Sequence, residues 1–306
     1  RLQRQMCIRD RPLSIALALA SGVTPEKGIY TAITAGFVIS FLGGSRVQIA
    51  GPTAAFATIV AGIVAKNGMD GLIIATLLAG VILILMGFLR LGNLIKFIPY
   101  TITTGFTSGI AVTIFIGQIK DFLGLTIVSE EPLIETMDKL KAVFQFISTT
   151  NVQALLVGVI SLLILILWQY LPGFCKKIPP SLIAVLVGSA MVALLNMNVN
   201  TIGDLYEISN KLPSISLPAF SLKTVQNVLP DAFTIAILAA IESLLSCVVA
   251  DSMVNSRHRS NMELIAQGVG NIGSALFGGI PATGAIARTA ANIKNGGRTP
   301  IAGMVH

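Results

Sequence analysis

Two short segments interrupt the apolar stretches of this chain with glycine, proline and hydroxyl residues. They read GGSRVQIAGPTAAFATIV from Gly43 and GGIPATGAIARTAANI from Gly278, at corresponding points of the two halves. A broken helix exposes backbone N–H and C=O groups, so within lipid it persists only where it is buried in protein or lines a polar cavity. Paired interruptions of this kind indicate a binding site where the two halves meet.

The first interruption places a helix start after a short extended run. Residues 46–49 have a β-like pattern that includes Gln48, a further polar candidate, and Gly51 with Pro52 allows a turn into a helix. The unpaired N–H groups of a helix N-terminus and its partial positive charge stabilise an anion. A Thr hydroxyl there can contact the anion or cap the helix. The alternative is an ordinary kink in a packed bundle. The candidate anion-binding residues here are Thr53, Ala54 and Ala55.

The second interruption repeats the pattern. Residues 283–289 (TGAIART) again run from extended chain into helix, so two helix N-termini can face each other and direct their dipoles at one point. Arg288, one turn into the helix, adds a full positive charge. An arginine at membrane depth is costly unless it faces a cavity or has a partner, which favours a binding role over snorkelling to the interface. The candidates here are Ala285, Ile286, Ala287 and Arg288.

Glu242 is interpreted as the only carboxylate deep within an apolar helix, in the run ILAAIESLLS from Ile237. Burial disfavours the ionised form of a carboxyl group, so Glu242 could take up and release a proton during a transport cycle. Ser246 lies one turn further on the same helix face and is a secondary candidate. The alternative is a permanent structural pair between Glu242 and Arg288.

Composition indicates a polytopic membrane protein. The 306 residues are 54% hydrophobic and only 11% charged, which leaves too few polar residues to cover a soluble globule. The net charge of +7 comes from Lys and Arg in short loops between apolar spans. That distribution is the bias of cytoplasmic loops, whereas a nucleic-acid-binding protein would carry a basic stripe with aromatic residues. We therefore expect a lipid bilayer, and no nucleic acid, as a partner.

Hydrophobic periodicity predicts a series of membrane helices, with Pro52, Pro180 and Pro230 at or just before helix starts. The predicted helices are Leu13–Gly22, Gly28–Leu42, Pro52–Ala65, Gly71–Leu89, Tyr100–Ile119, Val152–Tyr170, Ser181–Leu195, Asp231–Asp251, Met262–Phe277 and Ala285–Lys294. The segment between residues 120 and 151 is expected to be a net acidic loop on the side opposite the basic loops.

The remaining polar residues indicate no metal or cofactor. Cys7, Cys175 and Cys247 are far apart and lack metal-ligand spacing. His258 lies in the loop SMVNSRHRSN without a neighbouring carboxylate or Cys in its sequence, and is expected to be a solvated loop residue. The chain also lacks the HExxH and GxSxG motifs and paired catalytic carboxylates at membrane depth, so no enzymatic activity is predicted.

Both ends of the chain have unusual features. Residues 1–11 (RLQRQMCIRDR) are strongly basic and join abruptly to an apolar run, and they are interpreted as non-native or disordered. The last six residues resemble the opening of another apolar span, so the sequence is expected to be a fragment.

Four stretches resemble the SulP family of anion transporters, the sulfate permease family to which the SLC26 proteins belong. They are LGGSRVQIAGPTAAF, KFIPYTITTGFTSGIAVTIFIGQIKDFLGL, AAIESLLSCVVADSM and FGGIPATGAIARTAANIKNGGRTPIAGMVH. The resemblance implies fourteen membrane segments in two inverted repeats of seven, of which the last three or so, and a C-terminal STAS domain, are absent here. It also implies a homodimer and a substrate held between residues 53–55 and 285–288.

The resemblance divides residues 12–306 into core elements at about 12–95 and 231–306 and gate elements at about 97–230. Sodium-coupled bicarbonate members resemble this chain but carry Asp where Glu242 stands and Thr where Ile286 stands. Because sodium requires oxygen ligands and Ile286 offers none from its side chain, proton coupling through Glu242 is favoured.

The sequence thus predicts proton-coupled secondary transport of a small anion, with a multi-pass chain in the bacterial plasma membrane. Backbone N–H groups and one Arg suit sulfate, bicarbonate, chloride and small dicarboxylates alike. A passive anion channel or an exchanger is an alternative. A nucleobase transporter of the same architecture is another, although it would be expected to place carboxylates against a base edge.

Overall fold

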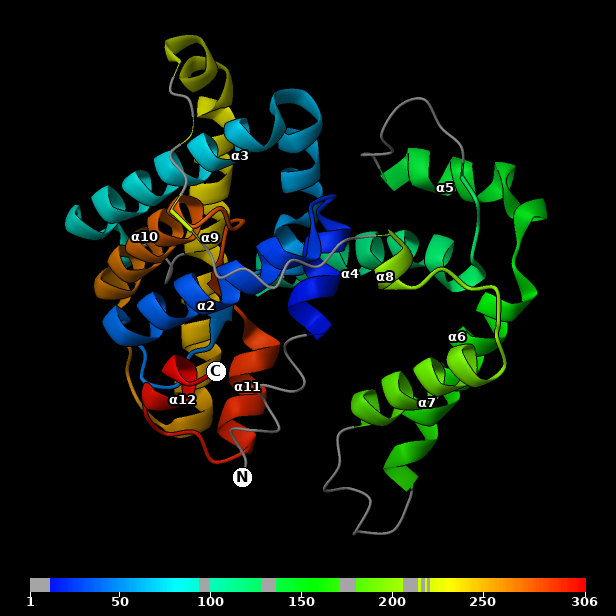
Figure 1. Ribbon diagram of the computed structural model, residues 1–306. Helices are drawn as coiled ribbons and strands as arrows, with labels where there is room; N and C mark the ends of the chain where they lie inside the picture. The colour runs from blue at the N-terminus through cyan, green and yellow to red at the C-terminus, as the bar shows by residue number, and fades with distance from the viewer. Residues whose placement is uncertain are drawn as a thin grey trace. The chain divides into compact units, whose positions relative to one another are not determined.

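The computed structural model describes residues 12–93, 100–127, 136–170, 180–205, 214–215, 218 and 221–306. It separates into two compact units, one made of residues 1–105 with 208–306 and the other of residues 106–207. Helices dominate both units, as predicted for an all-α protein with two short strands (Figure 1). The assignment of residues 1–11 and the division into core and gate elements stay predictions.

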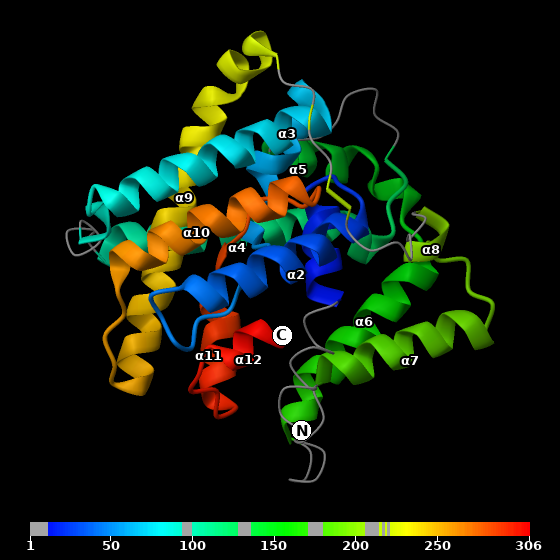
Figure 2. The ribbon, with the colours of Figure 1, turned by 60° about the vertical axis from the view of Figure 1, so that its left-hand side comes forward.

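Four helices form the frame of the first unit. α10 (Ser260–Leu276) packs against both α2 (Pro25–Leu42) and α3 (Ala57–Phe88), and α9 (Leu222–Val254) runs steeply across α3 and α10 (Figure 2). Glycine permits the close crossing of α3 and α10. A Cβ added to Gly80 of α3 would lie 2.7 Å from the carbonyl oxygen of Gly268 on α10, so a side chain at that position would push the helices apart.

The two interruptions of the sequence pair with each other. β1 (Ala50–Gly51) and β2 (Thr283–Gly284) form an antiparallel ladder with Ala50 opposite Gly284 and Gly51 opposite Thr283. β1 continues through the 3-10 turn η1 (Ala54–Phe56) into α3, and β2 continues into α11 (Ile286–Lys294), which α12 (Ile301–Met304) follows. The predicted passage from short strand to helix is therefore present in both segments.

Two predicted helices are joined end to end in α3, and a glycine separates them. Gly68 has φ 68° and ψ −172°, a backbone conformation outside the helical region that costs glycine little because it lacks a Cβ. The break falls between the predicted helices at residues 52–65 and 71–89. Residues 54–67 therefore form the half-helix that begins at the first interruption.

Helix α9 corrects the prediction of a helix start at Asp231. The helix begins at Leu222 and contains Pro230 in its interior. A proline removes one backbone donor from a helix, but nearby hydroxyl groups and packed neighbours can satisfy the groups that it frees. The carbonyl that Pro230 frees is that of Gln226, an exposed residue in the first turns of α9, whereas the Thr234 hydroxyl donates to the carbonyl of Pro230 itself at 3.0 Å. Proline thus marks a position within α9 rather than its end.

The second unit contains most of α4 (Tyr100–Leu123), with α5, α6, α7 and α8. α6 (Val152–Leu167) packs against α7 (Pro180–Leu194), and α8 is the single turn Ile202–Leu205 (Figure 1). α5 (Thr136–Gln145) corrects the expectation of a loop between residues 120 and 151. Its alternation of charged and apolar residues makes one helix face that buries Ala142 and Val143.

Apolar side chains cover the outside of the first unit and polar side chains lie inside it. Phe37 and Phe41 of α2 and Phe88 of α3 are exposed, whereas Gln267 and Asn271 of α10 are fully buried. Two described helical stretches, Ala54–Phe88 and Leu222–Val254, are long and apolar enough to cross a membrane. This arrangement places a polar interior around the paired strands.

Candidate functional site

The paired strands bring the two helix N-termini together. Besides the ladder, the Ala285 N–H donates to the Ile49 carbonyl at 2.9 Å, and the Ile49 N–H donates to the Thr289 hydroxyl at 3.0 Å. Thr53 and Ala285, the residues before η1 and α11, both have extended backbones. Each helix therefore starts abruptly from a strand, with first-turn N–H groups that have no acceptor within the helix.

The Thr53 hydroxyl does not take the predicted capping role at the first helix start, and its contact with an anion stays a prediction. It makes no cap to the helix and instead donates to the Glu242 carboxylate at 3.0 Å. Ala54 and Ala55 are half-buried in the 3-10 turn that follows. Backbone N–H groups at this end therefore stay uncapped by Thr53, while its side chain links the half-helix to α9.

The second helix start offers a smaller set of donors than predicted. The Ala285 N–H is occupied by the strand contact with Ile49. The N–H groups of Ile286, Ala287 and Arg288 form the first turn of α11, where no intrahelical acceptor exists. Ala287 is exposed and Ile286 is half-buried, so this turn is accessible from at least one side.

Arg288 is buried against the opposite strand. Arg288 is only 6% exposed to solvent. A Cβ added to Gly51 would lie 2.6 Å from the Arg288 Nη1 atom. Gly51 therefore leaves room for the guanidinium to lie on the backbone of β1. A snorkelling arginine would keep its guanidinium in water, whereas Arg288 is buried within the protein.

Glu242 lies where three elements meet. It accepts the Thr53 hydrogen bond, and the Arg288 guanidinium is close enough to interact with its carboxylate electrostatically. One residue each from the first half-helix, α9 and α11 is thus brought into a single polar cluster. The sequence predicted anion binding for Thr53 and Arg288 and proton coupling for Glu242, and these roles stay predictions.

The two secondary candidates are engaged by protein partners. Ser246 lies 3.2 Å from Thr289 through their hydroxyl groups. Gln48 donates from Nε2 to the Ser243 hydroxyl at 3.0 Å and accepts from the Cys247 thiol at 2.7 Å. Both side chains are buried. Their bonds join α9 to α11 and to the segment before β1, so these side chains are not free to contact an anion at the N-termini of the two helices.

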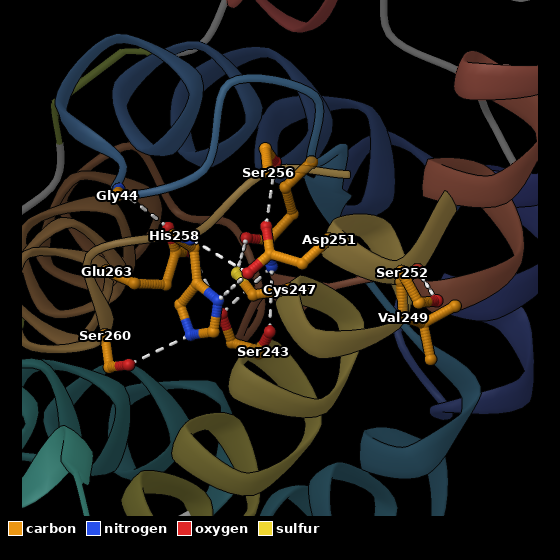
Figure 3. A network of polar contacts seen from close by, with 11 residues as sticks. Gly44, Ser243, Cys247, Val249, Asp251, Ser252, Ser256, His258, Ser260 and Glu263 are labelled. Atoms are coloured by element: carbon orange, nitrogen blue, oxygen red, sulfur yellow. Dashed lines mark hydrogen bonds and ion pairs between the residues drawn. The ribbon is translucent and has the colours of Figure 1, made fainter. Parts of the chain in front are cut away.

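Glu263 was not among the residues predicted from the sequence, and it corrects the interpretation of Glu242 as the only carboxylate deep within an apolar helix: Glu263 is fully buried in α10, whereas Glu242 is half-buried. Its carboxylate accepts from the Gly44 N–H at 2.9 Å and the Ser243 hydroxyl at 3.0 Å (Figure 3). It also accepts from the Gln267 amide at 3.0 Å. A signal was available in the sequence: Glu263, Gln267, Asn271 and Ser274 make a polar stripe at helical spacing along an apolar segment.

The polar stripe of α10 also anchors the chain that leads into β2. Asn271 donates from Nδ2 to the Ala282 carbonyl at 2.9 Å and accepts from the Ala282 N–H at 2.9 Å. Ser274 donates to the Ile280 carbonyl at 2.7 Å. These contacts satisfy the backbone groups of an irregular segment, which is required away from water.

His258 is a second correction, because it has a carboxylate neighbour. Its Nδ1 lies 2.8 Å from Asp251 Oδ2 and its Nε2 lies 2.9 Å from the Ser260 hydroxyl (Figure 3). Its side chain is only 8% exposed. The loop folds back onto the end of α9, and sequence distance concealed the pairing with a residue seven positions earlier.

These features define the class of protein. Two broken helices with adjoining N-termini, inside a bundle that is apolar outside and polar inside, are typical of a membrane transporter with discontinuous helices. The Sulfate permease family model matches residues 7–306, and the chain belongs to this family. Membership of a permease family agrees with the prediction that the chain is not an enzyme.

Two curated relatives cover nearly the whole chain. It is 45% identical to YvdB of Bacillus subtilis, a protein named as a candidate sulfate transporter, over 96% of this chain and 55% of that protein. It is 34% identical to the bicarbonate transporter BicA of Picosynechococcus sp., over 96% of this chain and 53% of BicA. The chain spans about half the length of the curated relatives it matches.

Two solved structures share the fold. The transmembrane domain of a cyanobacterium bicarbonate transporter BicA matches with a TM-score of 0.86 and 30% identity, covering 99% of this chain and 78% of that chain. SLC26A9 matches with a TM-score of 0.83 and 20% identity, covering 97% of this chain and 50% of that chain, which indicates the fold alone. The predicted family, transporter fold and integral-membrane character are confirmed.

Proposed function

We propose that this protein performs secondary active transport of a small anion, held between the two adjoining helix N-termini and coupled to proton movement through Glu242. The observation that carries the proposal is the antiparallel pairing of β1 with β2, which brings the first turns of the half-helix and α11 to one place. Two helix dipoles and a buried Arg288 give that place a positive potential. An anion is the ligand that such a potential attracts.

The anion is of the sulfate, bicarbonate or dicarboxylate class. The donors available at the two helix starts are the backbone N–H groups around Ala54 and Ala55 and those of residues 286–288. Such donors recognise oxyanions without demanding one particular shape. Relatives named for sulfate and for bicarbonate support this class.

Proton coupling is proposed from the contacts of Glu242. Its carboxylate accepts from Thr53 at the first helix start and interacts with Arg288 of the second. A change in its charge therefore acts on both halves of the anion site at once. Ile286 supplies no side-chain oxygen for sodium, which favours a proton as the coupling ion. A passive channel or an exchanger would use the same anion site without this coupling.

The remaining parts of the proposal concern the setting of the protein. We place it in the bacterial plasma membrane as a homodimer. Residues 12–95 and 231–306 serve as the core that carries the anion site, and residues 97–230 serve as the gate. The exposed aromatic residues of α2 and the exposed end of α3 are suited to contact with lipid.

The test is uptake into proteoliposomes containing the purified protein. Radiolabelled sulfate, bicarbonate and succinate are supplied with and without an imposed pH gradient, acidic outside, and Arg288→Ala serves as the binding-site control. We expect one anion to accumulate against its gradient only when the pH gradient is present. Transport that follows the anion gradient alone would support the channel or exchanger, and absence of uptake for the whole panel, with a nucleobase taken up instead, would refute the anion assignment.

A further inference from the structure

Three hydrogen-bond donors from different parts of the chain surround the carboxylate of Glu263. It lies in the first turn of α10 and is fully buried. Its donors are the Gly44 N–H, the Ser243 hydroxyl and the Gln267 amide, which come from three elements or loops. A backbone N–H and an amide NH2 can only donate, so the network uses Glu263 as an acceptor.

The Ser243 hydroxyl passes this orientation on to Gln48. Because the hydroxyl hydrogen points at Glu263, the Ser243 oxygen is left as an acceptor, and it receives the Gln48 Nε2 hydrogen bond at 3.0 Å. The other end of the Gln48 amide accepts from the Cys247 thiol at 2.7 Å. Both ends of the amide are thereby fixed, and Gln48 has one orientation.

Gln48 in turn sets the position of β2. Its amide lies directly against Gly284, where an added Cβ would collide with Nε2. Gln48 is two residues before β1, and the Ile49 carbonyl next to it accepts the Ala285 N–H. The relay from Glu263 through Ser243 to Gln48 therefore ends at the point where both strands turn toward their helices (Figure 3 shows its first part).

Adjacent residues of α9 contact the two carboxylates separately. Ser243 contacts Glu263, whereas Glu242 itself contacts Thr53 at the helix start. Glu263 is surrounded by donors of the scaffold, and Glu242 faces the proposed anion site. The two carboxylates therefore have different tasks, although Glu242 is adjacent in α9 to Ser243, which contacts Glu263.

We propose that Glu263 is a positioning residue for anion transport, acting through Ser243 and Gln48 to fix the register of β1 and β2 and thereby the facing of the two helix N-termini. The effect expected on transport rests on the proposed function. The effect expected on the structure of β1 and β2 does not rest on it. The relay fixes the geometry of the donors without touching the anion. Its loss is expected to raise the KM for the anion rather than only to lower the amount of folded protein.

The test compares Glu263→Gln and Ser243→Ala with the wild type in proteoliposomes. Gln at position 263 turns an NH2 group toward the Gly44 N–H. Ala at 243 removes the hydroxyl that joins Glu263 to Gln48, and it leaves in place the other donors of Glu263 and the 3.3 Å contact of Gln48 Nε2 with the backbone carbonyl of residue 243. Ser40→Ala, a buried serine of α2 outside the relay, is the matched control. Ser243→Ala also keeps the test decisive if Glu263→Gln does not fold.

Small misplacements at a binding site have large effects, so we expect KM to rise on the order of tenfold in Glu263→Gln and about threefold in Ser243→Ala. The pH profile should stay that of the wild type, in contrast to Glu242→Gln, and Ser40→Ala should leave KM unchanged. Equal KM values in wild type and both relay variants, with only the yield of folded protein reduced, would overturn the proposal.

Hydrogen–deuterium exchange separates this proposal from the proposed function. We expect faster exchange in residues 44–51 and 283–289 of Ser243→Ala, and unchanged exchange in α7 of the second unit. Exchange rates at the two strands equal to those of the wild type would overturn the relay. Faster exchange there, in a protein whose wild type binds and transports no anion, would uphold the relay and refute the anion-transport function.

Discussion

The Thr53 hydroxyl donates a 3.0 Å hydrogen bond to the Glu242 carboxylate, and this single contact joins the start of the first half-helix to the middle of α9. Because a donated hydrogen bond stabilises the ionised carboxylate, the bond makes the charge of Glu242 depend on the position of the half-helix. The reverse also holds, since protonation of the carboxylate weakens the bond. We therefore expect proton binding by Glu242 and movement of the helix start to be linked energetically.

Thr53→Val tests this link, because valine keeps the shape of threonine and removes the hydroxyl. Without the donor, the ionised form of Glu242 loses stabilisation, and the neutral form persists to higher pH. We expect the pH profile of anion uptake to shift toward higher pH. Thr53→Ser, which keeps a hydroxyl, is the control and should retain the profile of the wild type. An unshifted profile in the valine variant would show that the hydrogen bond does not influence coupling.

Glu242→Gln fixes a neutral side chain of nearly the same size. We expect it to abolish acid-stimulated accumulation of anion against a gradient, while some exchange across the membrane continues because the backbone donors and Arg288 are retained. The measurement is uptake in proteoliposomes with an imposed pH gradient. Full concentrative uptake by the variant would mean that Glu242 is structural and that any coupling proton is carried by another group.

Arg288→Ala removes the side-chain charge from the second helix start and leaves the backbone donors of α11 in place. Hydrogen bonds to charged groups contribute about 1.5–3 kcal/mol, so we expect anion affinity to fall by roughly ten- to a hundredfold. Folding should be largely intact, which thermal unfolding in detergent can check. Arg288→Lys, with the charge retained, should show a smaller loss. Unchanged anion affinity in the alanine variant would place Arg288 outside the binding site.

The strand-to-helix segments could be predicted from sequence because few residue types permit them. Gly51 with Pro52, and the glycine at 284, are residues that a continuous membrane helix would not favour, and both positions lie at the paired strands. The break at Gly68 was similarly visible as a gap between two apolar runs. In each case the local backbone chemistry determines the structure.

Features that depend on contacts between distant parts of the chain could not be predicted from the local sequence. Pro230 resembled a helix start, but α9, which packs against α3, begins at Leu222 and continues through it. Glu263 lies within the helix that was predicted from Met262, but no neighbour in the sequence revealed that the fold wraps Gly44 and Ser243 around its carboxylate. The donors that make such a group tolerable come from distant parts of the chain.

The loop after α9 provides the last prediction. Asp251 accepts from the His258 backbone N–H at 2.9 Å and the Ser256 hydroxyl at 3.0 Å, besides its contact with the His258 ring at 2.8 Å. The ring also reaches Ser260 at the first residue of α10. His258 therefore ties the end of one helix to the start of the next.

His258→Ala removes both ring contacts while the backbone N–H bond remains, so the mostly buried Asp251 keeps only part of its hydrogen bonding. We expect a loss of about 1–3 kcal/mol in the free energy of unfolding, the usual cost of leaving a buried polar group partly unsatisfied. Thermal unfolding in detergent measures this as a lower Tm, and Ser252→Ala, whose hydroxyl bonds only to the Val249 carbonyl within α9, serves as the control. His258→Asn, which can still donate toward Asp251, should recover part of the loss. If the Tm of His258→Ala equals that of the control, the ring contacts contribute nothing to the connection between α9 and α10, and the bonds to Asp251 from the His258 backbone N–H and the Ser256 hydroxyl hold the loop.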